Sequence, residues 1–185
     1  MWFASRSSVS VSLSLLIAAF VALPGCSDSP LYTRSSSQVR VLQRPARGKI
    51  ADVTSLADST EVTRDLGGSL NVGDSEIGLS SLSVPPEAVE EATKVKLVKI
   101  KVNKLGDVSA ELGPDGFRFV RPVTFLLSYK GADLTDVDEA TLRIYHYNTE
   151  AGVWELVPGS VPDTTRKIVS APLWHFSRYV IGSNG

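Results

Sequence analysis

The stretch VTFLLSY, from Val123 to Tyr129, alternates large apolar residues with smaller or more polar ones. Successive side chains of a β-strand point to opposite faces, so every second residue here shares one face. Arg121-Pro122 stands just before the stretch, at an entry where the missing N–H of proline does no harm. The pattern predicts a strand whose buried face carries Val123, Phe125, Leu127 and Tyr129.

Short β-type runs of this kind continue from Gly67 to the end of the chain, separated by Gly, Pro, Asn and Asp. No long stretch shows helical period, and only Pro85 to Thr93 could form a single helical turn. Short strands with turn residues between them favour an all-β fold, here a single antiparallel β-sandwich. We expect strands near residues 69–72, 77–84, 95–102, 123–129, 142–147, 153–157, 167–171 and 175–181.

The run KVKLVKIKV, residues 94–102, breaks the alternation once. Val95 and Leu97 are out of phase with the apolar residues that follow, which are Val98, Ile100 and Val102. A β-bulge between Leu97 and Val98 would return all five to the core. Without a bulge, one of the two groups would face water, so we predict the bulge.

The first 25 residues have the layout of a secretory signal. Arg6 is their one charged residue, and the apolar run LLIAAFVAL follows at 15–23. This run is far shorter than the roughly 20 residues that a membrane-spanning helix needs. We therefore expect residues 1–25 to be a signal peptide.

Cys26, the only cysteine of the chain, follows this segment directly. Leu23-Pro24-Gly25-Cys26 resembles the lipobox of bacterial lipoproteins, in which the cysteine is diacylated and becomes the N-terminus. The resemblance implies a lipid anchor on Cys26, and Ser27 after it is similar to an outer-membrane sorting signal. Two or three acyl chains, at about 0.8 kcal/mol per buried CH₂, would hold the chain stably in a membrane. The expected location is the cell envelope, facing the periplasm or the cell surface.

Residues 26–66 are expected to form the lipid anchor and a flexible linker, because SDSPLYTRSSSQ is rich in serine. Five cations and no acid lie between residues 34 and 49: Arg34, Arg40, Arg44, Arg47 and Lys49. Such a run can adhere to an anionic surface, or it can be a solvated linker with a charge bias. We favour the solvated linker, because acids follow at once.

The charge of the chain argues against a dedicated nucleic-acid binder. The full chain holds 19 basic and 20 acidic residues. Removing residues 1–25 takes away only Arg6, so the balance stays close to neutral. Nucleic-acid-binding domains are usually strongly basic.

Three fragments carry a resemblance to a known family: Gly67-Gly68-Ser69-Leu70, LSVPPEAV at 82–89 and LGPDGFRFVRPVTFLLSY at 112–129. Together they resemble the ZU-five domain, the β-sandwich of zonula occludens proteins, netrin receptors, ankyrins and many bacterial surface lipoproteins. The resemblance implies a domain over 67–185. The glycines at its start suit a positive φ or close packing, and Asn148 to Gly152 suits a hairpin loop.

Some eukaryotic members of that family cut themselves between the phenylalanine and the serine of a His-Phe-Ser triplet, and His175-Phe176-Ser177 matches it. Ser177 would attack the preceding carbonyl and His175 would take its proton, since residues i and i+2 of a strand share a face. The cut would free only nine residues, from Ser177 to Gly185. We favour the other interpretation, a final strand whose Trp174 and Phe176 fill the core.

Two further groups are candidates for binding. His146 is expected to be partly buried and satisfied by a hydroxyl or a carbonyl, because two histidines without a thiol give no zinc spacing. Four acids, Asp133, Asp136, Asp138 and Glu139, could present oxygens to calcium, but their spacing is not that of an EF-hand. A solvated loop in which Thr135 caps a helical turn is the interpretation we favour.

The chain carries no nucleophile elbow, phosphate loop, dinucleotide motif or zinc signature. We therefore expect a non-catalytic, lipid-anchored envelope domain that serves protein interaction or surface structure, with no cofactor, no metal and no nucleic acid. Its partners would be the membrane, through Cys26, and a protein or an envelope polymer. The alternatives are a self-cleaving module that cuts between Phe176 and Ser177, and a ligand binder that uses the acidic loop.

Overall fold

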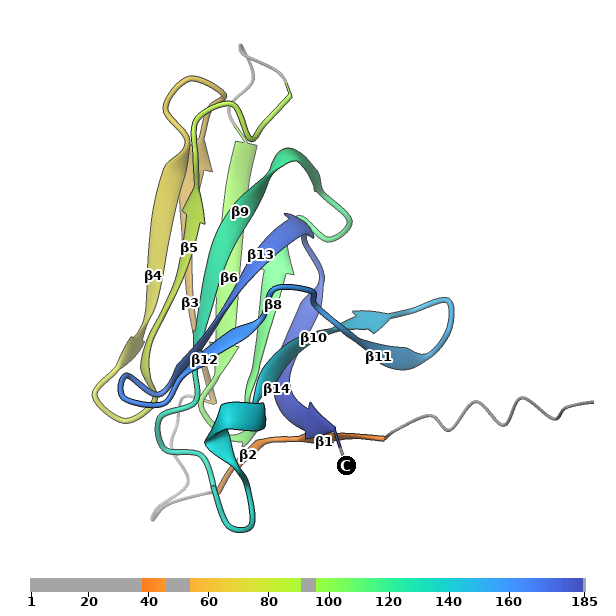
Figure 1. Ribbon diagram of the computed structural model, residues 1–185. Helices are drawn as coiled ribbons and strands as arrows, with labels where there is room; N and C mark the ends of the chain where they lie inside the picture. Colours follow the sequence, from red (N-terminus) through yellow and green to blue (C-terminus); the bar gives the residue numbers. More distant parts are fainter. Residues whose placement is uncertain (1–37, 46–53, 91–95, 185) are drawn as a thin grey trace, which may run out of the picture. The chain divides into compact units, whose positions relative to one another are not determined.

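The structure is a computed structural model that describes residues 38–45, 54–90 and 96–184. Its described part consists of antiparallel strands and one 3-10 helix, η1 (Glu139–Thr141) (Figure 1). The all-β prediction is confirmed. None of the described helical residues forms a segment long and apolar enough to cross a membrane.

The described residues form two sheets and one small ribbon, all within the unit that extends from Ser36 to Gly185. The larger sheet runs β11-β10-β14-β8-β6-β3, with β1 beside β14, and the smaller runs β12-β13-β9-β5-β4. The larger sheet contains β1 (Val39–Val41), β3 (Ser55–Val62), β6 (Lys96–Asn103), β8 (Ser109–Gly113), β10 (Arg143–Asn148), β11 (Val153–Leu156) and β14 (Arg178–Asn184). The smaller contains β4 (Gly68–Asp74), β5 (Gly78–Val84), β9 (Arg118–Ser128), β12 (Val161–Asp163) and β13 (Ile168–His175), and the ribbon pairs β2 (Gln43–Arg44) with β7 (Gly106–Asp107).

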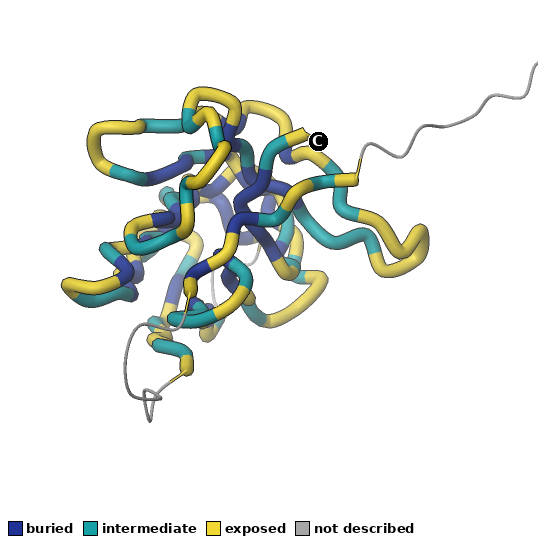
Figure 2. Tube along the Cα trace, turned by 90° about the horizontal axis from the view of Figure 1, so that it is seen from below, coloured by how far each residue is buried: buried dark blue, intermediate teal, exposed yellow. Residues whose placement is uncertain are grey.

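One hydrophobic core takes residues from both sheets, which gives a sandwich-like arrangement. The buried segments lie in the interior in Figure 2, and the exposed ones lie mostly in the loops. The four residues of the expected inner face are all fully buried: Val123, Phe125 and Leu127 on β9, and Tyr129 directly after the strand ends at Ser128. The prediction for this strand is confirmed, and the strand itself begins five residues earlier, at Arg118.

The predicted bulge in β6 is wrong. β6 pairs with β3 and with β8 in unbroken register, and the side chain of Leu97 points outward with 47% of its area exposed. Val98, Ile100 and Val102 are buried as expected, whereas Val95 lies outside the described residues. A bulge between Leu97 and Val98 would disturb the hydrogen bonds of β6 to β3, and full burial of one leucine contributes only about 1.5–3 kcal/mol.

The folded part begins well before Gly67, which corrects the linker expected over residues 26–66. β1, β2 and β3 all lie within that segment, and β3 pairs with β6 along eight positions. Leu42 is buried in the core, its N–H donates to the Ile181 carbonyl (2.9 Å), and its carbonyl accepts from the Val108 N–H (2.8 Å). Residues 26–37 and 46–53 lie outside the described part.

The final strand expected at 175–181 is two strands in different sheets. β13 ends at His175 in the smaller sheet and β14 begins at Arg178 in the larger one. The chain crosses between the sheets at Phe176-Ser177. Phe176 is fully buried as predicted, with ring centroids 4.9 Å from Phe119 and 5.9 Å from Phe117. Trp174 is 55% exposed, so its predicted place in the core is wrong: Leu173, its neighbour on the strand, points inward instead.

Candidate functional site: a groove on the outer face of the larger sheet

A groove of about 660 Å³ lies against β3, β6, β8 and β14, on the face of the larger sheet that points away from the core. We refer to this hollow as the sheet groove. Its volume is within the range of about 300–1,000 Å³ that is usual for ligand sites. Ser177 and Arg178 also line it, so the crossover after His175 forms part of its wall.

Strand pairing builds the floor of the sheet groove in two rows. In the first row, Lys101 of β6 is paired with Ala57 of β3 on one side and Glu111 of β8 on the other, and Glu111 is paired with Arg178 of β14. In the second row, Lys99 lies between Ser59 and Gly113. Directly paired residues have neighbouring side chains on one face. The first row therefore carries three charged side chains in succession, and the second carries one lysine between two small residues.

Each charged side chain of the first row has a partner of opposite charge, and Arg178 also contacts an aromatic ring. The Lys101 ammonium lies 3.2 Å from a Glu111 carboxylate oxygen, and the Arg178 guanidinium lies 3.1 Å from that of Asp107. The guanidinium carbon of Arg178 is also 5.5 Å from the centre of the Trp154 ring. Exposed ion pairs of this kind contribute little to stability, so these groups can exchange partners with a ligand at small cost.

The structure places His175 and Ser177 differently from the expectation that they share one strand face. His175 is the last residue of β13, and Ser177 lies in the crossover. The Phe176 carbonyl oxygen between them accepts a hydrogen bond from the Gly116 N–H (3.1 Å), and Nδ1 of His175 lies 3.3 Å from the same oxygen. The histidine ring therefore faces the carbonyl of the bond that would be cut.

The two histidines of the chain lie side by side, which the sequence analysis missed. The ring centroids of His146, on β10, and His175, on β13, are 5.2 Å apart. Both rings lie near the ring of Tyr179, with centroids 6.5 and 6.4 Å from it. His146 has a main-chain hydrogen bond at Tyr147, in line with the expected carbonyl partner. It also has a carboxylate partner that was not expected, because its Nε2 lies 3.3 Å from Glu155 Oε2. Burial, and secondly the neighbouring His175, lower the pKa of His146 below its ordinary value, and these effects outweigh the opposing effect of Glu155.

Protein donors already occupy the carboxylates of the acidic loop. Oδ1 of Asp133 accepts from the Thr135 N–H (3.0 Å) and hydroxyl (2.7 Å). The Glu139 carboxylate accepts from the Tyr129 hydroxyl (2.7 Å) and pairs with the Lys167 ammonium at 2.6 Å. These contacts hold the pKa of both carboxyl groups below their ordinary values.

The helical turn of the acidic loop is capped by Asp138, so the predicted cap, Thr135, is wrong. Oδ1 of Asp138 accepts from the N–H of Ala140 at 3.0 Å, at the start of η1. Asp136 takes a positive φ of 56°, and its carbonyl accepts from Arg40 of β1 (3.1 Å). Among the described residues, no group of three or more His, Cys, Asp or Glu side chains is arranged to hold a metal ion.

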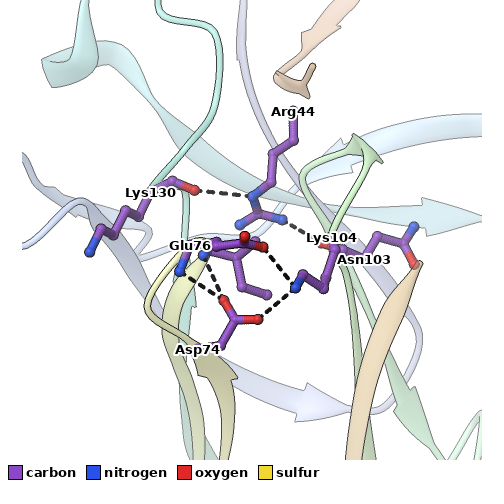
Figure 3. A network of polar contacts seen from close by, with 7 residues as sticks. Arg44, Asp74, Glu76, Asn103, Lys104 and Lys130 are labelled. Carbon is purple, nitrogen blue, oxygen red and sulfur yellow. Dashed lines mark hydrogen bonds and ion pairs between the residues drawn. The ribbon is translucent and has the colours of Figure 1, made fainter. Parts of the chain in front are cut away.

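Two cations of the basic run have structural roles, which corrects the prediction of a solvated linker for them. Arg40 donates to the carbonyls of Thr135 and Asp136. Arg44 is buried and donates to three main-chain carbonyls beside the ion pairs of Lys104 with Asp74 and Glu76 (Figure 3). Arg34, Arg47 and Lys49 lie outside the described residues, as does Cys26.

No family model matches this chain, and no curated protein matches it either. The likeness to the ZU-five domain therefore stays a prediction from the residues quoted above.

Proposed function

We propose that this chain is a non-catalytic, lipid-anchored protein of the bacterial envelope that binds an envelope component in the sheet groove. The observation that carries the proposal is the groove itself, whose floor takes side chains from four strands in register. Rigid sheet positions hold binding groups more precisely than loops do. The lipobox-like Leu23-Pro24-Gly25-Cys26 supports the membrane anchor.

Binding is expected to depend on the open space above Gly113. A Cβ added there would meet only the Lys99 Cβ, at 3.9 Å, so Gly113→Gln fills the groove without straining the main chain. We expect the fragment 27–185, which contains every described residue, to sediment with washed bacterial envelopes, and Gly113→Gln to weaken this at least tenfold.

The matched control places the same side chain on the other sheet. Ser83 is exposed on β5, and Ser83→Gln should leave sedimentation unchanged. Equal loss in both variants, or no loss in Gly113→Gln, would contradict binding in the sheet groove.

A self-cleaving module is the second candidate, favoured by the contact of His175 Nδ1 with the Phe176 carbonyl (3.3 Å) and by the Gly116 N–H on the same oxygen. A polarised carbonyl is what the attacking Ser177 hydroxyl would need.

Mass spectrometry of the full chain, purified from membranes of bacteria that express it, distinguishes the two candidates. We expect a protein that begins at an acylated Cys26 and ends at Gly185, and we expect the acyl mass to disappear in Cys26→Ser. A species that ends at Phe176, and that Ser177→Ala restores to full length, would support self-cleavage instead.

A further inference from the structure

Charged side chains of both signs line the sheet groove. Lys99, Lys101 and Arg178 lie there with the carboxylates of Glu111 and Asp115, and Arg178 is also paired with Asp107. A polyanion would meet the carboxylates and a polycation would meet the cations, and like charges placed together across an interface are unfavourable. This mixture of positive and negative groups therefore favours a ligand without net charge.

The same groups favour a ligand that is rich in hydroxyls. Ammonium and guanidinium groups only donate hydrogen bonds, whereas ionised carboxylates only accept them. A hydroxyl does both, so neighbouring hydroxyls of one molecule can accept from Lys101 and donate to Glu111, whose charged atoms are 3.2 Å apart. Charge-assisted hydrogen bonds of this kind are the strong ones.

An aromatic wall adds an apolar surface next to these polar groups. Tyr147 lines the sheet groove, and the ring of Trp154 packs behind it with centroids 5.1 Å apart. Arg178 lies over Trp154, so the wall is held by contacts on more than one side. Tyrosine and tryptophan offer rigid, amphipathic contact area at low entropic cost, which suits the C–H face of a sugar ring.

From this combination we infer that the sheet groove binds an uncharged glycan chain of the cell envelope. The inference rests on the proposed function and names the ligand class for the same site. Sugar rings present hydroxyls at their edges and C–H groups on their faces, and the groove offers paired charges on its floor and an aromatic ring on its wall.

Isothermal titration of the full chain, purified in the sugar-free detergent lauryldimethylamine oxide, tests the inference. The probes are tetramers of β-1,4-linked N-acetylglucosamine, cellulose, maltose-type glucan and β-1,3-glucan, with a hyaluronan tetrasaccharide as the anionic comparison. We expect at least one neutral tetramer to bind more tightly than hyaluronan. Gly113→Gln should weaken that binding at least tenfold, Tyr147→Ala should also weaken it, and Ser83→Gln should change it less than twofold.

The inference is overturned if no neutral tetramer binds, if hyaluronan binds more tightly than all of them, or if neither Gly113→Gln nor Tyr147→Ala weakens binding while circular dichroism shows both variants folded. Its failure can be told apart from failure of the proposed function. If protease treatment of the envelopes abolishes groove-dependent sedimentation, the partner is a protein: the glycan inference then falls, and the proposed function stands.

Discussion

Arg44→Ala is expected to lower the free energy of unfolding by about 3–5 kcal/mol, the usual cost of removing a partner from a buried, charged hydrogen-bonded site. The Arg44 guanidinium donates to the carbonyls of Asn103 (2.6 Å), Ser128 and Lys130 (3.2 Å). Figure 3 shows the contacts with Asn103 and Lys130. Asn103 ends β6 in the larger sheet and Ser128 ends β9 in the smaller one. One side chain thus joins the two sheets at one end of the core.

The environment of Arg44 makes this cation costly to bury and costly to remove. Burial lowers its pKa to about 10, against an opposing effect of Asp74, so the group remains charged at neutral pH. Without it, three carbonyls lose a donor, and each buried polar group left unsatisfied costs about 1–3 kcal/mol. Arg44→Lys should recover only part of the loss, because one ammonium cannot reproduce the planar fork of donors.

Urea unfolding of the fragment 27–185, followed by circular dichroism, measures this effect. Arg121→Ala is the matched control, because Arg121 is exposed and its guanidinium pairs with Glu87 at 2.6 Å on the surface. Exposed pairs contribute about 0–1 kcal/mol. A loss in Arg44→Ala no larger than that in Arg121→Ala would show that Arg44 does not join the sheets.

The sequence predicted best those strands that have one strongly apolar face. β9 could be recognised because four large residues occupy alternate positions. β3, with the sequence SLADSTEV, was missed because it is an edge strand on which only Val62 is fully buried. β8 was missed because its inward residues, Ala110 and Leu112, give too short an apolar pattern in SAELG.

The candidate site could not be predicted, because it depends on which strands pair. The row that contains Ala57, Lys101, Glu111 and Arg178 takes one residue from each of four strands. Of these, β3 and β14 lie far in the chain from β6 and β8. A sequence shows each of these residues as an ordinary exposed position of a strand. The same holds for His146 and His175, whose contact joins β10 of the larger sheet to β13 of the smaller one.

Buried charges escape prediction for a different reason. In the run VRVLQRPARGK, Arg40 and Arg44 have the same sequence context of cations without acids. Arg40 lies at the surface and Arg44 in the interior. The difference arises because β2 lies near the ends of β6 and β9. There the carbonyls of Asn103, Ser128 and Lys130 accept hydrogen bonds from the Arg44 side chain.

Gly67→Ala is expected to destabilise the protein by about 3–4 kcal/mol, because two separate penalties add at this position. Gly67 has a φ of +63°, which costs a residue with a Cβ about 1–2 kcal/mol. An added Cβ would also overlap the Val84 carbonyl oxygen and lie 2.8 Å from the Pro85 carbonyl carbon. These are main-chain atoms at the end of β5 that cannot rotate away, and overpacking of this kind costs about 1–3 kcal/mol.

Gly116→Ala separates the two penalties. Gly116 has a similar φ of +73°, but no atom lies within 4 Å of an added Cβ. Only the cost of the backbone conformation applies to this variant, so its free energy of unfolding should fall by about 1–2 kcal/mol. Urea unfolding of both variants under identical conditions gives the difference directly. Equal losses would mean that the turn from β3 into β4 yields to the added methyl group. A larger loss in Gly67→Ala would show that the close approach of Gly67 to the Val84 carbonyl helps to fix how the chain passes from the larger sheet to the smaller one.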